Sequence, residues 1–146
     1  MALSIKRFFA TAADLVITSS AALVSSGLSS PIAANEKQKL VAWIPISVGA
    51  TGGVRTLIAP PAGGTLLRVT TILYNTGAGT VIPSPLVTVF TNALANAGEH
   101  WLKIEATVLN GTTAGNVVVQ IAQNTSDALS LTVQTGATLD VDVYTT

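Results

Sequence analysis

The sequence predicts an all-β protein, and three observations lead to this fold class. Apolar and polar side chains alternate over several stretches, which is typical of strands with one buried and one wet face. Residues that break strands recur about every 8–12 positions, as they do between short antiparallel strands. Hydrophobic residues make up 49% of the chain and charged residues 10%, so Thr and Ser carry most of its polarity.

The predicted strands follow one another from about residue 15. Apolar runs rich in Thr, Val, Leu and Ile place strands at 15–18, 21–32, 40–48, 54–59, 65–75, 80–82 and 86–92. Clear alternation marks further strands at 101–108, 117–121, 129–133 and 139–144. Because alternate side chains share a face, we expect Leu129, Leu131 and Val133 to face inward together.

Glycine, proline and asparagine separate these strands. Residues 49–53 form one glycine-rich turn, 60–64 cannot continue a strand, and Asn110-Gly111 suits a two-residue hairpin. Pro45 lies inside an apolar run, and because proline cannot donate to a strand ladder we expect an edge or a bulge there. About 8–10 short strands without a convincing internal helix predict an antiparallel β-sandwich of jelly-roll type.

Residues 1–13 stand apart as an N-terminal arm, and residues 14–146 form the predicted jelly-roll domain. Four apolar residues of the arm share one face of a helix, with Lys6 and Arg7 beside it. These four are Ile5, Phe8, Phe9 and Ala12. A helix this short needs a partner to stay ordered, so we expect an anchoring arm that becomes helical on binding. The alternative is a frayed terminus.

Composition excludes several classes of protein. Seven basic and seven acidic residues give a net charge of zero, so the chain lacks the basic surface of a nucleic-acid binder. No uninterrupted apolar run is long enough for a transmembrane helix, and we expect no membrane partner. Without Cys there is no disulfide scaffold. Residues 1–34 fit a secretory signal poorly, because Asp14 interrupts the apolar run.

The residues do not indicate an enzyme or a cofactor. The sequence has no Gly-x-Ser-x-Gly motif whose serine His100 could activate as a general base. One His without Cys supplies too few ligands for zinc. Asp140 and Asp142 share a strand face and could join Asp127 or Glu105 around calcium, but a solvated strand face is the preferred interpretation. The larger aromatic residues are expected to anchor the core or a trimer interface. They are Trp43, Tyr74, Trp101 and Tyr144.

Two stretches of the sequence carry a resemblance to a known family. The first includes Ser20-Ala21-Ala22-Leu23 and continues from Gly27 through Ala33-Ala34-Asn35-Glu36. The second begins at Trp101 and includes Gln120-Ile121-Ala122-Gln123-Asn124-Thr125-Ser126 and residues 136–141. Together they resemble the small jelly-roll domain of tailed-phage virion proteins. They are also similar to the trimeric fold of tumour necrosis factor and complement heads. The resemblance covers about 14–143, departs at Ile121 where an aromatic is expected, and leaves 49–98 unmatched.

The resemblance implies a structural protein of a phage particle, built as a homotrimer. Because the chain has a short arm and no shaft or repeat, the preferred hypothesis is a decoration or cement protein on the outer surface of the head. Its partner would be the major capsid protein, bound through Ile5, Lys6, Arg7, Phe8 and Phe9. The alternative is a tail-fibre or spike tip that binds a host receptor. A secreted cytokine-like trimer is a third hypothesis.

Overall fold

The structure is a computed structural model that describes residues 4–49, 52–75, 80–85, 89–94 and 97–144. These residues contain no helix, so none of them belongs to a helix that could cross a membrane. Their strands are β1 (Ser4–Ala10), β2 (Leu15–Ile17), β3 (Val24–Ile32), β4 (Lys37–Val48), β5 (Val54–Ala59), β6 (Thr65–Asn75), β7 (Thr80–Pro85), β8 (Val89–Asn92), β9 (Gly98–Leu109), β10 (Gly115–Ala122), β11 (Leu131–Val133) and β12 (Thr138–Tyr144).

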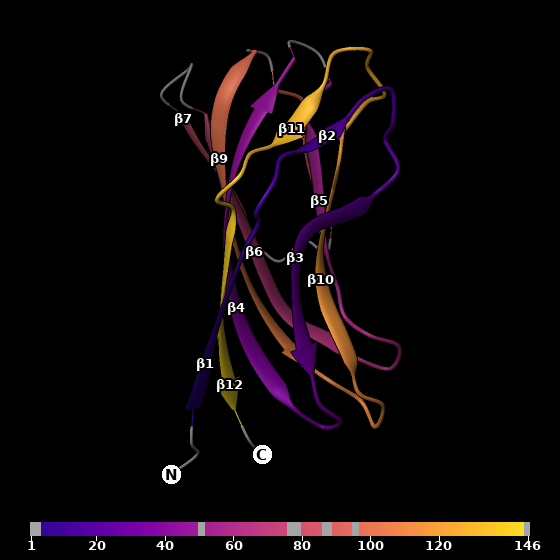
Figure 1. Ribbon diagram of the computed structural model, residues 1–146, viewed down its shortest axis with the longest axis vertical. Coiled ribbons are helices and arrows are strands. Elements are labelled where there is room, and N and C mark those ends of the chain that lie inside the picture. The colour runs from indigo at the N-terminus through magenta and orange to yellow at the C-terminus, as the bar shows by residue number, and fades with distance from the viewer. Residues whose placement is uncertain (1–3, 50–51, 76–79, 86–88, 95–96, 145–146) are drawn as a thin grey trace.

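The strands form two antiparallel sheets that face each other (Figure 1). The large sheet has the order β1-β12-β4-β9-β6-β7, and β11 joins it by pairing with both β4 and β2. The small sheet has the order β3-β10-β5-β8. The all-β sandwich predicted from the sequence is therefore confirmed.

The strand pairing is that of a rolled-up ribbon. The first strand pairs with the last, β1 with β12. Moving inward from both ends of the chain, β3 pairs with β10, β4 with β9 and β5 with β8. These four pairs alternate between the two sheets, which is the arrangement of a jelly roll. Two pairs remain. The pair of β2 and β11 lies in the large sheet next to β4, and the pair of β6 and β7 is added beyond β9 and widens the large sheet.

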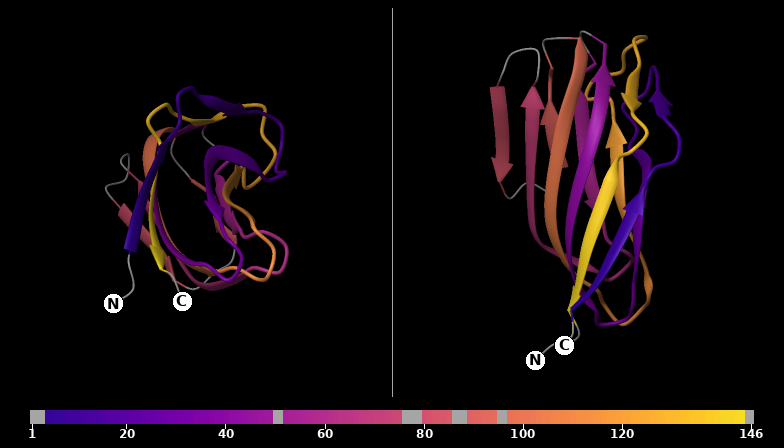
Figure 2. Two further views of the ribbon diagram at one scale, coloured as in Figure 1. Left: turned by 60° about the horizontal axis from the view of Figure 1, so that its bottom comes forward. Right: turned by 60° about the vertical axis from the view of Figure 1, so that its left-hand side comes forward.

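The edge strands of the large sheet are β1, β7 and the short β2, which among the described strands pairs only with β11. The right-hand view of Figure 2 shows β7 at one side of the sheet. Two prolines of β7, Pro83 and Pro85, are tolerated because an edge strand needs only one neighbour. Both termini lie at the same end of the molecule, since β1 and β12 are antiparallel neighbours (Figures 1 and 2).

The core lies between the sheets and follows the alternation of the strands. Along β4 and β9 the even-numbered residues point inward, and Ile44 and Leu102 are fully buried. The small sheet contributes Val117, Val119 and Ile121 of β10, all with no exposed surface. These residues belong to one contiguous hydrophobic cluster, in which apolar burial is the main stabilising force.

Residues 4–10 form β1, so the structure does not show the helical face expected at the N-terminus. Lys6 and Phe8 point to one side of the strand, and Arg7 and Phe9 to the other, where Phe9 packs against the core. Thr11 fastens the following segment, because its N–H donates to Ala137 O over 2.9 Å. The apolar positions Ile5, Phe8 and Phe9 follow helical spacing, but pairing with β12 overrides this local pattern and selects the strand.

Pro45 does not lie at an edge, contrary to the sequence prediction. Strand β4 is central, with β9 on one side and with β12 and then β11 on the other. Pairing with β12 ends at Trp43, and pairing with β11 begins at Ile46. The missing N–H of Pro45 therefore falls where β4 changes partner, and no ladder hydrogen bond is lost there.

Two smaller expectations were also wrong. Leu129 is 53% exposed and precedes β11, so it does not face inward with Leu131 and Val133. Asn110-Gly111 does not close a two-residue hairpin, because β9 and β10 belong to different sheets. Instead the buried Asn110 side chain donates to Ala33 O and Thr113 O, each at 2.8 Å, and orders the crossing between the sheets.

Candidate functional site

Two aromatic side chains stack on the outer face of the large sheet, and a third lies next to them in the strand register. Trp43 of β4 and Tyr74 of β6 stack with ring centroids 5.9 Å apart and an interplanar angle of 20°. Trp101 of β9 lies beside them, because it pairs with Tyr74 in the strand register. Trp43 is 36% exposed and Trp101 43% exposed. We call these three residues the aromatic strip.

A cation completes the aromatic strip. Lys103 pairs with Trp43 in the register, and its Nζ lies 5.3 Å from the centroid of the Trp43 ring, within range of a cation–π contact. The same Nζ forms an ion pair of 2.6 Å with Glu105 Oε1. The hydrogen bond from Lys103 lowers the pKa of Glu105, and the hydrogen bond to Glu105 raises the pKa of Lys103.

A hollow of about 150 Å³ opens on the same face, further along the strands. Lys39 of β4 and Arg68 of β6 flank Thr107 of β9, which pairs with both of them, and Glu105 lies on its side toward Lys103. We call it the basic hollow. Neither Lys39 nor Arg68 was singled out from the sequence, although Lys39 shares its strand face with Trp43 and Thr107 shares its face with Trp101.

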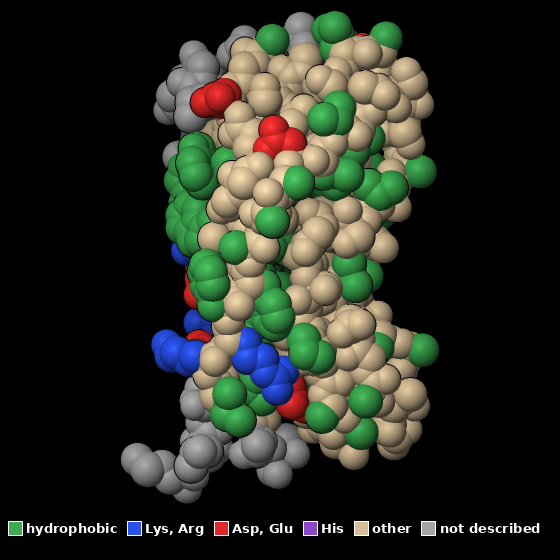
Figure 3. Space-filling view, in the orientation of Figure 1, with side chains coloured by type: hydrophobic (Ala, Val, Ile, Leu, Met, Phe, Trp, Pro, Cys, Tyr) green, Lys and Arg blue, Asp and Glu red, His purple; other side chains and the backbone are tan. Residues whose placement is uncertain are grey.

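Most charged residues of the chain gather on this outer face of the large sheet. By strand register and alternation they are Lys6, Lys37, Lys39, Arg68, Glu99, Lys103, Glu105, Asp140 and Asp142. Figure 3 shows hydrophobic side chains along the left edge of the molecule, over the large sheet, with lysine and arginine side chains below them. This face therefore combines exposed aromatic rings with charge.

The outer face of the small sheet is different in kind. Its half-buried or exposed side chains are Ser25, Ser29 and Pro31 of β3, Asn116, Val118 and Gln120 of β10, Arg55, Leu57 and Ala59 of β5, and Val89 and Thr91 of β8. Of the described residues, Arg55 is the one charged side chain on this face, and its Nη1 lies 3.5 Å from Ala21 O. We call it the uncharged face.

The structure brings together three of the four aromatic residues predicted as core or interface anchors. Trp43, Tyr74 and Trp101 form the aromatic strip and lie outside the core. Tyr144, 37% exposed, lies at the end of β12 opposite Ser4, away from the other three. The core alternative is therefore wrong for these residues, and a role in an interface stays a prediction.

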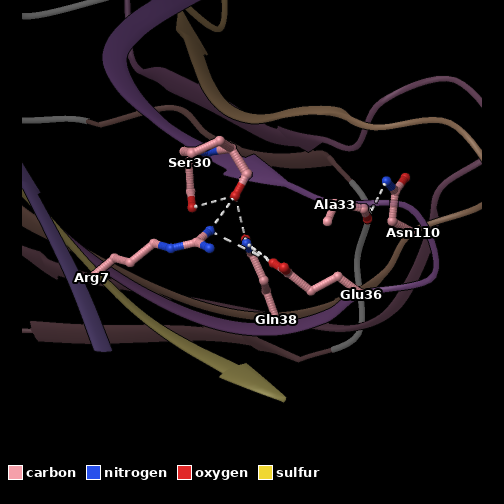
Figure 4. A network of polar contacts seen from close by, with 7 residues as sticks. Arg7, Ser30, Ala33, Glu36, Gln38 and Asn110 are labelled. Atoms are coloured by element: carbon pink, nitrogen blue, oxygen red, sulfur yellow. Dashed lines mark hydrogen bonds and ion pairs between the residues drawn. The ribbon is translucent and has the colours of Figure 1, made fainter. Parts of the chain in front are cut away.

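The residues predicted to bind a capsid all lie in β1. Ile5 is 47% exposed and Phe8 63% exposed, and Lys6 Nζ lies 3.7 Å from Asp142 Oδ1. Arg7 turns toward the small sheet, where its Nη1 donates to Pro31 O over 2.5 Å and lies 3.6 Å from Glu36 Oε1 (Figure 4). Gln38 donates to the same two acceptors, at 2.8 and 2.6 Å. This network holds the edge strand β1 against β3.

The two motifs of the resemblance lie at opposite ends of the roll, and both organise loops. Asn35 adopts a positive φ of 57° in the Ala33–Glu36 turn, and its N–H donates to Gly111 O over 2.8 Å. Gln123 is completely buried, and its side chain hydrogen-bonds Ser20 N, Asp127 N and O, and Leu129 O. Both motifs are thus explained by the packing of the fold.

The acidic residues considered for calcium do not converge. Asp140 and Asp142 lie on the outer face of β12, Glu105 is paired with Lys103, and Asp127 belongs to the loop held by Gln123. Across the described part of the chain no three His, Cys, Asp or Glu side chains are grouped as metal ligands would be. His100 is buried on the inner side of β9.

No protein-family model matches the chain, and no curated protein matches it in sequence. Solved structures give weak likenesses to viral chains. A chain from infectious bursal disease virus, Gx strain, has 12% identity and a TM-score of 0.27. A chain of the VP2 subviral particle of the same virus has 11% identity and a TM-score of 0.25. Each match covers 97% of this chain and 40% of the viral chain. TM-scores of this size carry no inference about function.

Proposed function

We propose that the chain is a non-enzymatic structural protein of a virus particle, a homotrimer that decorates the outer surface of a phage head. The observation that carries the proposal is the uncharged face, a whole sheet face with Arg55 as its one described charge. The cores of protein interfaces are depleted of charge, and a threefold axis can bury one such face from each protomer. The resemblance of residues 14–143 to phage virion domains supports the location.

The second contact of the proposal is with the major capsid protein, through β1. This strand ends the large sheet, so one of its two edges has no neighbour in the sheet order. Ile5 and Phe8 add exposed apolar surface beside that edge. An edge of this kind can accept an extended segment of another chain as an additional strand. A capsid segment that pairs with β1 would tie the decoration to the shell.

The test is to add purified protein to phage heads that lack it. We expect binding by a species of three times 14.8 kDa, measured by native mass spectrometry and by sedimentation with the heads. I5S and F8S should weaken sedimentation with the heads, and V16S, which removes a valine that is 60% exposed on β2, should not. A stable monomer contradicts the trimer, and binding unchanged by I5S and F8S contradicts the role of β1.

The aromatic strip favours a second candidate, the tail-fibre or spike tip. The strip groups the exposed Trp43 and Trp101 with the half-buried Tyr74, and such a group is a common anchor for a receptor. Immunogold labelling of intact particles separates the two candidates. Label on the head supports the decoration protein, and label at the end of the tail supports the fibre tip.

A further inference from the structure

The aromatic strip and the basic hollow lie on one line across the outer face of the large sheet. Moving along β9, Trp101 stands at one end, Lys103 and Glu105 follow, and Thr107 forms the floor of the basic hollow. The six residue-to-residue steps from Trp101 to Thr107 span about 20 Å, and the three strands β4, β9 and β6 are about 10 Å across. The combined surface is therefore long and narrow.

These dimensions suit a short linear ligand better than a folded protein partner. The surface measures about 200 Å² by these strand spacings, whereas each partner of a stable protein complex buries roughly 800 Å². A linear chain of rings lying along β9 would cover it completely. The exposed ring surfaces of Trp43 and Trp101 can contact the polarised C–H bonds of a sugar ring.

The charges of the surface indicate that the ligand also carries an acidic group. Lys39 and Arg68 stand on opposite sides of Thr107, and the Glu105 carboxylate between them and Lys103 is already paired at 2.6 Å. On the far side of β4, Asp142 of the neighbouring strand β12 pairs with Lys39 in the register and lies 3.7 Å from Lys6. Two cations separated by a strand can bind a carboxylate or sulfate, and arginine can do so through two parallel hydrogen bonds.

We propose that the aromatic strip and the basic hollow bind an acidic oligosaccharide. Its sugar rings stack on Trp43, Tyr74 and Trp101, and one of its acidic groups enters the hollow between Lys39 and Arg68. A single-stranded nucleic acid also combines rings with anions, but its closely spaced phosphates need a continuous basic groove. Here Lys39 and Arg68 stand at one end of the strip, Lys103 within it is already paired with Glu105, and the acidic residues Asp140 and Asp142 lie on the neighbouring strand β12. The site is independent of the proposed place in a virion.

The test measures quenching of tryptophan fluorescence in the purified protein. The probes are tetragalacturonate, a sialic acid tetramer and a heparin tetrasaccharide, with maltotetraose as the neutral control and oligothymidylate as the nucleic acid control. We expect at least one acidic probe to bind roughly tenfold more tightly than maltotetraose, the difference expected from one charge-assisted hydrogen bond. R68A should abolish that difference, and W43A should weaken every probe.

Matched variants outside the site keep the test specific. F8A and K6A alter an aromatic residue and a cation that share the outer face but lie on β1, and neither should change binding. Failure of all three acidic probes, equal binding of maltotetraose, or tighter binding of oligothymidylate would each overturn the proposal. Since binding is measured on the isolated protein, failure here leaves the capsid-sedimentation test of the proposed function unaffected.

Discussion

The two outer faces of the sandwich have the same alternation but different residue types. The large-sheet face carries aromatic rings and charges, among them Trp43, Lys103 and Glu105. The uncharged face carries Ser, Thr, Asn, small apolar residues and Arg55. Alternation alone marks both as outward faces, so it cannot separate a face that binds a sister subunit from one that meets solvent or a ligand. The kind of outward residue makes that distinction.

The largest expected effect comes from placing a charge on the uncharged face. V118E introduces a carboxylate at the centre of the proposed trimer interface, where its desolvation would not be compensated. We expect the native mass to fall from three times 14.8 kDa to 14.8 kDa. I72E makes the same change at a half-buried position of β6 on the other face and should leave the trimer intact. Equal effects of the two variants would remove the distinction between the faces.

The next effect tests whether the aromatic strip is ordered by its own contacts. W43A removes the stacking with Tyr74 and the contact with Lys103, and should lower the free energy of unfolding by about 1–2 kcal/mol. A double-mutant cycle with Y74A should give a coupling free energy of about 0.5–1.5 kcal/mol, measured by urea denaturation. A coupling free energy of zero would mean that the rings only lie near each other.

A smaller effect is expected for the Arg7 network, which holds β1 of the large sheet against β3 of the small sheet. R7M removes the hydrogen bond to Pro31 O and the contact with Glu36, and should cost about 1 kcal/mol. Hydrogen exchange of the β1 amides should become faster. K6M is the control, because the Lys6 side chain is 85% exposed and its loss should change stability by less than about 0.5 kcal/mol. Equal exchange in the two variants would contradict the role of Arg7.

The smallest effect concerns pH and the Lys103–Glu105 pair. Because the folded state lowers the pKa of Glu105, the pair stabilises the fold above the ordinary Glu pKa of 4.5. That stabilisation is lost as the pH falls through the lowered folded-state pKa. E105Q should cost at most about 0.5 kcal/mol at pH 7, since the Glu105 side chain is 42% exposed, and nothing in strong acid. Chemical denaturation across this range tests it, and a larger deficit in acid would contradict it.

The sequence predicted most clearly those strands that carry their own alternation, as β9 and β12 show. Prediction from the sequence was wrong where pairing with distant strands, and not the local residue pattern, determines the structure of a segment. Residues 4–10 have helical spacing of apolar residues yet form a strand because they pair with β12. Pro45 is tolerated at the centre of a sheet because two different strands meet beside it.

The aromatic strip and the basic hollow could not be predicted from the sequence for the same reason. Trp43, Tyr74 and Trp101 are far apart in the chain, and only the register of β4, β9 and β6 places them together. The basic hollow needs the same register, since Lys39 and Arg68 meet across Thr107. Side-chain parity within one strand could have placed Lys39 with Trp43, but not either of them with Arg68.

The rolled ribbon also constrains how the chain reaches this structure. Ser4 pairs with Tyr144, so closing the β1–β12 edge requires contact between the two ends of the described chain. Contacts of such long sequence separation cost loop entropy before they are rewarded, and folds dominated by them fold in roughly milliseconds to seconds. Until β1 pairs with β12, the β12 backbone has an unpaired edge, with Val141 and Val143 beside it. During refolding this transient edge is the place where two molecules would first aggregate.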